Sequence, residues 1–553
     1  MNKDNVVIRK MKIGLIIIYS LAHWLLCFIS GQWWDDWNYW INGAESIKTA
    51  YLESGIPQQA YNILSVMWIP NWGYRVVVFF VFLAVGLLFF SILTSVDFFS
   101  KEDAFWISAV AMTVVVNDAR ALLNCYGYTL ALLLFMIAFY IITRIRAYRG
   151  SRQIWMLRVF SWVLLLYSYT TESLLVFTGV IWLYLFYYIW NDNKEKQIIS
   201  KIIIFIKKYS DYLGLPFLFF CTKRLFFKPY GAYVGYNSIN LESLVDGILV
   251  LPFAAFKTGE NLIHSYLLQA SCVPMIVFLI VVLVYMMYAK KTENSMKQEK
   301  IRILATFILG CVVYCAGIFP YIVIRGEALK TIGPDGRDVM MAGFGVGIIV
   351  VAFCRIFPLK KYIQNFIPIL FIVLGIFHFN EWYLNYQEDW YHQKIFANGL
   401  ADKGELGDDD VILCDFSFNS PNISTRFYSL NGMSYLATGK MDKFFLNGIN
   451  DLRYGIVFNE NFQKGYNADD FDISDMTIDA VMFINNIPIS NSKCLEMRFD
   501  EILRKDIFER KIGNLTDVQY VRIDKAGSDS IYDLYKNSEL TSEGLKNIVL
   551  TAK

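Results

Sequence analysis

The chain has few charged residues for its length, and neither sign is in excess. Asp, Glu, Lys and Arg make up 18% of its 553 residues, and 51 basic side chains against 49 acidic ones leave a formal net charge of +2. A nucleic-acid-binding protein needs a basic surface, so this balance predicts no nucleic-acid partner. The sequence also has no Walker loop, no GxGxxG motif after a strand and no HExxH motif, and its four histidines are scattered. ATP-driven transport, nicotinamide chemistry and a zinc site therefore have no support.

Long apolar segments are abundant instead. Apolar residues make up 56% of the chain and aromatic residues 17%, a composition outside the range of soluble domains. Near-uncharged runs of roughly the 20 residues that a helix needs to cross a bilayer recur along the chain. The expected fold is a polytopic α-helical membrane protein with about eleven transmembrane helices, at residues 13–30, 73–95, 104–118, 121–142, 155–170, 173–190, 202–221, 267–289, 303–324, 339–357 and 362–379. Residues 245–256 are apolar but too short to span, which favours an interfacial or re-entrant helix.

Basic residues cluster in alternate loops between these runs, as is typical of loops on the cytoplasmic side. The clusters are Arg9 to Lys12, Arg144 to Arg158, Lys194 to Lys201, Lys290 to Arg302 and Arg355 to Lys361. This pattern predicts a cytoplasmic N-terminus in a multi-pass protein of the plasma membrane. Eleven crossings would then place everything after about residue 380 outside the cell.

Residues 381–553 contain no membrane-length apolar run and are expected to form a small extracytoplasmic α/β domain. Segments 410–414 and 479–484 are typical of buried strands, and a helix is expected to begin near Thr541. Cys414 and Cys494 could form a disulfide in this domain or remain two free thiols. The chain thus divides into a membrane domain, residues 1–380 with a first outer loop at 31–72, and a C-terminal domain.

The segment most suggestive of chemistry follows the first apolar run, on the expected outer side. It reads Gln-Trp-Trp-Asp-Asp-Trp-Asn-Tyr-Trp and runs from residue 32 to residue 40. Asp35 and Asp36, set among aromatic rings, would be partly desolvated, which raises a carboxyl pKa and favours general-base work on a hydroxyl. Trp34 and Trp37 offer flat faces suited to sugar rings and equally to a bilayer interface. A plain aromatic belt with two solvated carboxylates is the alternative.

A first span followed at once by an outer loop with an acidic pair, then many spans and a soluble outer C-terminal domain, resembles the GT-C superfamily of membrane glycosyltransferases. The resemblance covers topology along the whole chain and sequence only at Asp35 and Asp36. It implies a polyprenyl- or dolichyl-phosphate sugar as donor and a carboxylate of this loop as catalytic base, with Asp36 slightly preferred. It also implies that residues 38–73 form amphipathic helices along the membrane.

Further ionisable residues are expected on the same face. Asp118 and Arg120 lie between the third and fourth apolar runs, and Glu172 lies between the fifth and sixth. Charged groups at a membrane boundary are usually paired or functional, so all three are candidates for substrate binding. The simpler alternatives are that Asp118 and Arg120 neutralise each other and that Glu172 only terminates a helix.

Five basic residues are candidates for binding a donor phosphate on this face, where the positive-inside rule disfavours them. They are Lys223, Arg224, Lys228, Arg325 and Arg337. A lipid phosphate in the outer leaflet would attract such cations, and Arg can hold phosphate oxygens bidentately. Anchoring to lipid headgroups or plain solvation is the alternative. Some similar bacterial enzymes carry an Arg-His pair near Arg337, whereas this chain has Asp338 there.

These features favour an enzyme that moves a monosaccharide from a lipid-phosphate donor to a glycan, lipid or protein acceptor on the outer membrane face. Two alternatives stay open: a transporter or flippase of lipid-linked sugars, and a glycan polymerase or ligase that uses lipid-diphosphate donors. Transporters usually place ionisable residues near the middle of the membrane, often within a two-fold repeat, and neither feature is visible here. No cofactor is expected, although Asp35, Asp36 and Glu172 could together hold a divalent cation.

Overall fold

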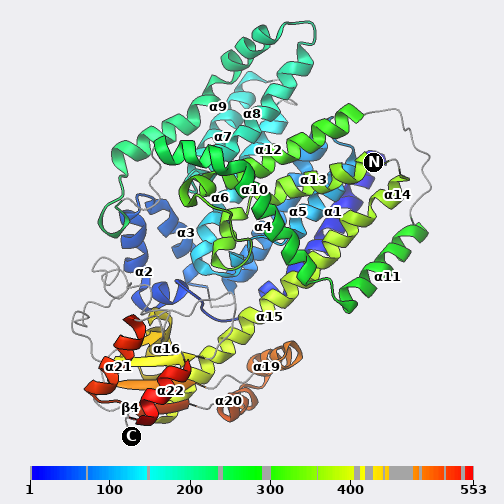
Figure 1. The fold of residues 1–553 in the computed structure, drawn as a ribbon. Coiled ribbons are helices and arrows are strands. Elements are labelled where there is room, and N and C mark those ends of the chain that lie inside the picture. Colours follow the sequence, from blue (N-terminus) through cyan, green and yellow to red (C-terminus); the bar gives the residue numbers. More distant parts are fainter. Residues whose placement is uncertain are drawn as a thin grey trace.

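Helices dominate the protein, and one small sheet lies in its C-terminal part (Figure 1). The structure is a computed structural model, which describes residues 3–69, 73–145, 150–234, 241–288, 300–357, 359–403, 411–416, 427–439, 443–447, 478–484, 489–515, 518–536 and 542–551. The α-helices up to the C-terminal part are α1 (Lys3–His23), α2 (Asp36–Glu53), α3 (Pro57–Met67), α4 (Gly73–Ser95), α5 (Lys101–Thr113), α6 (Tyr126–Ile145), α7 (Ser151–Ser168), α8 (Ser173–Asp192), α9 (Ile198–Phe226), α10 (Leu241–Leu268), α11 (Cys272–Tyr288), α12 (Lys300–Arg325), α13 (Ala342–Ile356), α14 (Lys361–Gln364) and α15 (Phe366–Lys403). Short 3-10 helices are η1 (Trp24–Cys27), η2 (Asp118–Ala121), η3 (Leu123–Cys125), η4 (Gly231–Tyr233) and η5 (Pro334–Val339).

An α-helix overlaps each of the eleven ranges that hydropathy predicts to cross the membrane. Among the described residues, six stretches are long and apolar enough to span a bilayer: Asp4–Cys27, Gly73–Ser95, Leu123–Ile145, Ser173–Asp192, Lys300–Arg325 and Tyr362–Leu400. Helices α10 and α11 meet the same test together, as a pair bent by 91°. Helices of this length and composition are stable only with their apolar surface in lipid or against one another. The protein is therefore a helical membrane protein.

The segments around the expected outer loops fold as follows. Residues 38–73, expected to be helical, contain most of α2 and all of α3, and Pro57 stands in the first turn of α3, where its missing N–H is harmless. The connection between the expected spans at 202–221 and 267–289 is mostly helical in the described residues. Lys223 and Arg224 lie in the last turn of α9, and residues 245–256 fall inside the 28-residue α10. Residues of mixed polarity continue the helix beyond both ends of residues 245–256, so α10 is longer than this apolar segment.

Charged side chains from several helices meet at one end of the membrane domain. Arg355, in the last turn of α13, donates from Nε to Asp103 Oδ1 at 2.9 Å, and Lys101 Nζ lies 2.8 Å from Asp4 Oδ1. Arg302, near the start of α12, donates to a backbone carbonyl in the turn between α4 and α5 at 2.8 Å. Asp103, in the first turn of α5, is thus paired with a cation from α13.

One long helix connects the membrane domain to the C-terminal part. Helix α15 has 38 residues, so at 1.5 Å per residue it is about 57 Å long. Its first half packs among membrane helices, including α1 and α5, and its second half leads to the sheet (Figure 1). Two side chains fix it against α1: the Tyr383 hydroxyl lies 2.9 Å from His23 Nδ1, and Asn380 donates to the Leu21 carbonyl at 2.9 Å.

The C-terminal part contains a four-stranded sheet in the order β2-β1-β3-β4. Strand β1 pairs in parallel with β2 and β3, opposing Ile412 to Phe445 and Ala480, while β4 runs antiparallel to β3. The strands are β1 (Val411–Phe416), β2 (Phe444–Asn447), β3 (Ala480–Ile484) and β4 (Val518–Arg522), and the helices are α16 (Phe427–Thr438), α19 (Asn491–Leu503), α20 (Lys505–Leu515), α21 (Lys525–Lys536) and α22 (Ser542–Thr551). Both segments expected as strands contain one, β1 and β3. Cys414 and Cys494 are both buried and no disulfide joins them, so the disulfide alternative is not realised.

Candidate active site

The acidic pair lies on the loop between α1 and α2, and this loop is fixed at several points. The Ser30 N–H donates to Gln387 Oε1 of α15 at 2.7 Å, and Arg75 of α4 donates to the Gly31 carbonyl at 2.7 Å. The Trp33 side chain is fully buried, and the Arg75 guanidinium lies 4.4 Å from the centre of its ring. The backbone that enters the acidic pair is therefore positioned by both α4 and α15.

Asp36 ties this loop to the connection between α5 and α6. Its side chain is 0% exposed. Oδ2 accepts from the backbone N–H of Leu123 at 3.0 Å, and Oδ1 accepts from the backbone N–H of Asn124 at 2.9 Å. Both N–H groups belong to η3, just before α6, where helix geometry leaves them without partners inside the helix. Asp36 thus occupies an anchoring position with both oxygens engaged.

Asp35 is the more accessible member of the pair and stands at the end of a hydrogen-bonded chain. Its side chain is partly exposed, and Oδ2 accepts from Asn124 Nδ2 at 2.9 Å. Asn124 in turn accepts from the Tyr51 hydroxyl at 3.2 Å, and Tyr51 accepts from the Tyr39 hydroxyl at 3.4 Å. Asn124 therefore holds both carboxylates, Asp36 by its backbone and Asp35 by its side chain. This network fixes the direction in which the Asp35 carboxylate points.

Trp34 is held in a strained conformation directly before the pair. Its φ of 53° lies in the left-handed region, which bulky residues rarely adopt. The guanidinium of Arg337, from η5, lies 5.0 Å from the centre of the Trp34 ring and 5.8 Å from that of Tyr128. Strain of this kind is usually retained at functional sites, and here the strained residue directly precedes the acidic pair and offers its ring to a cation.

Asp118 positions the segment that carries Arg337. The carboxylate is buried; Oδ2 accepts from the Gly333 N–H at 2.9 Å, and Oδ1 accepts from the Ala119 N–H at 3.1 Å. A Cβ added at Gly336 would lie 2.8 Å from Asp118 Oδ1, so only glycine lets the two segments approach this closely. Asp118, a candidate for substrate binding, therefore supports the site through the backbone of η5.

Arg325 and Arg337, which are alike in the sequence, have different environments. Arg325 donates to Asp335 at 2.9 Å and to Asp338 at 2.5 Å, so two carboxylates neutralise it. Arg337 also pairs with Asp338, at 3.7 Å, and its guanidinium stands over the aromatic rings. Asp338 therefore contacts both arginines, and Arg325 is the closer of the two. The sequence could not separate the two cations.

Glu172 and Lys223 form an ion pair with each other. Glu172 precedes α8 and Lys223 lies near the end of α9, so the pair joins two helix ends. Glu172 thus has Lys223 as its charged partner, and its expected contact with substrate stays a prediction. Arg224 and Lys228 are exposed, and the structure does not bring either of them into contact with the acidic pair.

Two of the sequence candidates are enclosed by protein. Trp37 is 0% exposed, and its indole N–H donates to Gln393 of α15 at 3.0 Å, so it has no free face for a sugar. Arg120 is also buried and donates to the carbonyls of Asn117 at 2.7 Å and Val116 at 3.0 Å, rather than forming an ion pair with Asp118. Both side chains support the local fold, and their expected contact with substrate stays a prediction.

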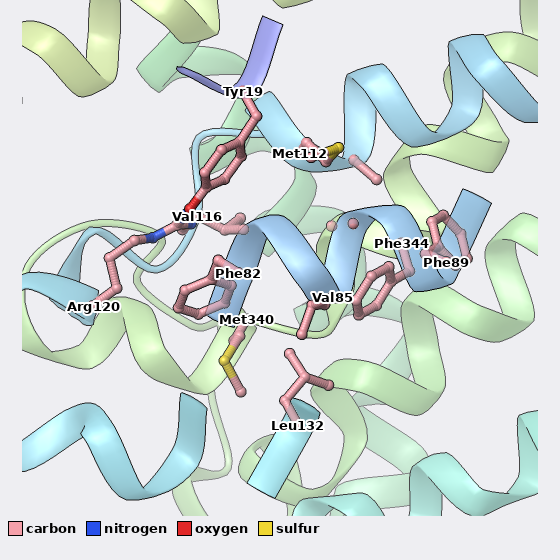
Figure 2. Close-up of a pocket in the computed structure, with 13 residues that line it drawn as sticks. Tyr19, Phe82, Val85, Phe89, Met112, Val116, Arg120, Leu132, Met340 and Phe344 are labelled. Atoms are coloured by element: carbon pink, nitrogen blue, oxygen red, sulfur yellow. The ribbon is translucent and has the colours of Figure 1, made fainter. Parts of the chain in front are cut away.

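Arg120 forms the polar end of an apolar pocket between α1, α4, α5, α6 and α13. Figure 2 shows its guanidinium beside Val116 and the hydroxyl of Tyr19 directed toward it. The rest of the lining is apolar, including Phe82, Val85, Leu132, Met340 and Phe344.

Asn124, Tyr51 and Tyr39 are site residues that sequence reasoning missed. Asn124 falls within the range counted as the fourth apolar run, and the tyrosines fall within the loop helix. A signal was present, since Asn124 is the one amide in the otherwise apolar start of that run. Among the described residues, no three Asp, Glu, His or Cys side chains are arranged to hold a metal ion. The cation site suggested for Asp35, Asp36 and Glu172 is not assembled in these ranges.

The two buried carboxyl groups predict that the folded protein loses stability as the pH rises. Burial raises the pKa of Asp36 and of Asp118 to about 7 each, although backbone N–H groups lower it in part. A folded-state pKa above the ordinary value means that the fold favours the protonated form. The stabilisation of the fold that comes from protonated Asp36 and Asp118 is fully present below the ordinary pKa of these groups. It is lost as the pH rises through about 7. The melting temperature in detergent should therefore fall between about pH 5 and about pH 8.5.

Asp118→Asn should flatten this dependence, because the amide does not titrate. Asp335→Asn is the matched control in the same region. Burial alone would raise the pKa of Asp335, but the hydrogen bond from Arg325 outweighs it and the pKa is lowered. The stability that the ionised Asp335 contributes is therefore lost when the pH falls, the opposite of Asp118. A melting curve for Asp118→Asn with the wild-type slope would contradict the prediction.

Comparison with known proteins adds no assignment to this geometry. No protein-family model matches the chain, and no curated protein is significantly similar to it. The residues described above are therefore the basis for any functional proposal.

Proposed function

We propose that this protein is a GT-C-type glycosyltransferase that moves a monosaccharide from a polyprenyl-phosphate donor to a glycan, lipid or protein acceptor at the outer membrane face. The observation that carries the proposal is the position of Arg337 over the ring of Trp34, the residue directly before the partly exposed Asp35. A carboxylate, a guanidinium and an aromatic face are the groups that this reaction needs.

The proposed reaction is a single displacement. Asp35 accepts the proton of an acceptor hydroxyl while the hydroxyl oxygen forms a bond to the anomeric carbon of the donor sugar. The bond from that carbon to the phosphate oxygen breaks, and the polyprenyl phosphate leaves with the electron pair. Arg337 stabilises the negative charge that develops on the phosphate, and Trp34 offers its face to the sugar ring. Attack opposite to the leaving group inverts the anomeric configuration.

The geometry favours Asp35 as the base, whereas the resemblance slightly favoured Asp36. Asp36 is fully buried with both oxygens bound to backbone N–H groups. A hydroxyl would have to displace these N–H groups to reach it, which would leave buried donors unpaired. Asp35 is partly exposed and is oriented by Asn124. In this proposal Asp36 positions the loop and Asp35 contacts the acceptor.

The topology proposed with this function has eleven crossings, a cytoplasmic N-terminus and an extracytoplasmic C-terminal domain. The charged network that includes Asp4, Asp103, Arg302 and Arg355 supports it, because the last two residues come from loops predicted to be cytoplasmic. The acidic pair follows α1 at its other end, together with η2, η3 and η5. All groups assigned a role in transfer would then face the outer leaflet.

A donor assay tests the proposal. Purified protein in proteoliposomes is supplied with polyprenyl phosphate carrying a labelled sugar, and envelope glycans from a strain lacking the gene serve as acceptor. Transfer of label to the acceptor, with release of polyprenyl phosphate, is the expected result. Movement of intact labelled lipid across the bilayer without covalent transfer would contradict it in favour of a flippase. Activity only with lipid-diphosphate donors would identify a polymerase or ligase instead.

A further inference from the structure

Helix α19 of the C-terminal part carries an exposed stripe whose character changes along the helix. Ser492 and Glu496 are exposed in its first half, whereas Phe499, Ile502 and Leu503 are exposed in its second half. The exposed fractions of these three apolar residues are 50%, 52% and 73%. Residues three, four and seven apart share one face of a helix, so polar and apolar positions follow each other on the same side. A surface helix in water would bury such residues or replace them.

The apolar end of this stripe continues the apolar surface of α1. The exposed residues of the first span, Asp4–Cys27, include Ile17 and Leu21 of α1 and Trp24 of η1, spaced as one lipid-facing stripe. The ring of Trp24 lies 6.1 Å from that of Phe28, and the ring of Phe28 lies 5.2 Å from that of Phe499. An unbroken series of aromatic rings thus connects the membrane surface of α1 to α19.

Polar contacts to the loop between η1 and α2 hold helix α19 beside the end of the first span. Arg498 donates from Nε to the Phe28 carbonyl at 2.6 Å and pairs with Glu501 at 2.8 Å. Ser30, two residues farther along the loop, donates to Glu501 at 3.3 Å. In Figure 1, α19 lies beside α15 and apart from the sheet, as expected for a helix that packs on α15 rather than on the strands.

We propose that the C-terminal half of α19 is an interfacial membrane anchor, with Phe499, Ile502 and Leu503 inserted into the leaflet that borders Trp24. The partner is the lipid bilayer itself. Trp24 lies in the turn that ends the first span, where aromatic residues usually contact the lipid headgroups. The exposed apolar residues of α19 extend the apolar surface from this point along the membrane interface. Arg504 is paired with Asp500 and Lys505 with Glu509, so burial of apolar area drives the insertion rather than attraction to anionic lipids. This inference is independent of the proposed enzymatic activity.

Photo-crosslinking of the full-length protein in vesicles tests the anchor. A benzophenone amino acid is placed singly at position 499, 502 or 503, and at position 492 as the matched control about two to three turns earlier on the same helix. After irradiation in phosphatidylcholine vesicles, mass spectrometry measures lipid adducts. The yield at 502 and 503 should exceed that at 492 several-fold, and adding anionic lipid should change it little.

Other outcomes would overturn the proposal. Crosslinks between two protein chains at 502 and 503 would identify a second copy as the partner of this face. Equal lipid yields at all four positions, or no lipid adducts at 502 and 503, would place α19 away from the bilayer. All the labelled positions are exposed, so the label displaces no buried side chain, and an unchanged size-exclusion profile confirms that the fold is retained.

Discussion

Asp35→Asn is expected to slow glycosyl transfer by a factor of about 10² to 10⁴, the range that a positioned general base contributes. Asparagine has the same shape and can still accept the hydrogen bond from Asn124 through its oxygen, but it cannot take up the proton of the acceptor hydroxyl. The measurement is the initial rate of labelled-sugar transfer in proteoliposomes at saturating donor. Expression and melting temperature should stay close to those of the wild type, because Asp35 is partly exposed.

Asp36→Asn is the informative comparison for this prediction. One side of the new amide would present an NH₂ group to a backbone N–H, either that of Leu123 or that of Asn124. Leaving a buried donor unpaired costs about 1–3 kcal/mol, so the free energy of unfolding should fall together with activity. If Asp36→Asn loses activity at unchanged stability while Asp35→Asn keeps a normal rate, Asp36 is the base and Asp35 has the supporting role. Wild-type rates in both variants would remove the acidic pair from the mechanism.

The helical part of the fold was predictable because the signal is local. A span is specified by the length and polarity of one continuous segment, and each of the eleven expected ranges overlaps an observed helix. The acidic pair could be selected as a candidate for the same reason, because it directly follows the first apolar run in the sequence. Helix length was less predictable: α10 extends well beyond residues 245–256, because flanking residues of mixed polarity continue the helix.

The assignment of roles within the site could not be read from the sequence, because it depends on contacts between distant segments. Asp36 meets Leu123 and Asn124, and Asp118 meets Gly333, each through a backbone N–H that no sequence pattern marks. The burial of Trp37 is similar, because it depends on Gln393 of α15. Residue type predicted which side chains carry chemistry, but only packing separated those that face the site from those that hold it together.

Arg337→Gln is expected to reduce kcat/KM for the lipid-phosphate donor by a factor of about 10² to 10³, the loss typical when one donor to a developing oxyanion is removed. Glutamine keeps a polar side chain but neither the charge nor the planar fork that binds two phosphate oxygens. Arg337→Lys should recover only part of the loss, since lysine restores the charge without the planar group that faces the Trp34 ring. Donor titrations at fixed acceptor measure both variants.

Arg325→Gln separates binding of the donor from support of the fold. Arg325 already neutralises Asp335 and Asp338, and the side chain of Asp338 is only 4% exposed. Its removal leaves a buried carboxylate without its closest cation, so the melting temperature should fall while the KM for donor changes little in the protein that remains folded. If Arg325→Gln instead lowers kcat/KM for the donor at unchanged stability, and Arg337→Gln does not, the phosphate binds at Arg325. The aromatic face of Trp34 would then have no part in placing the donor, because among the two arginines only Arg337 lies over it.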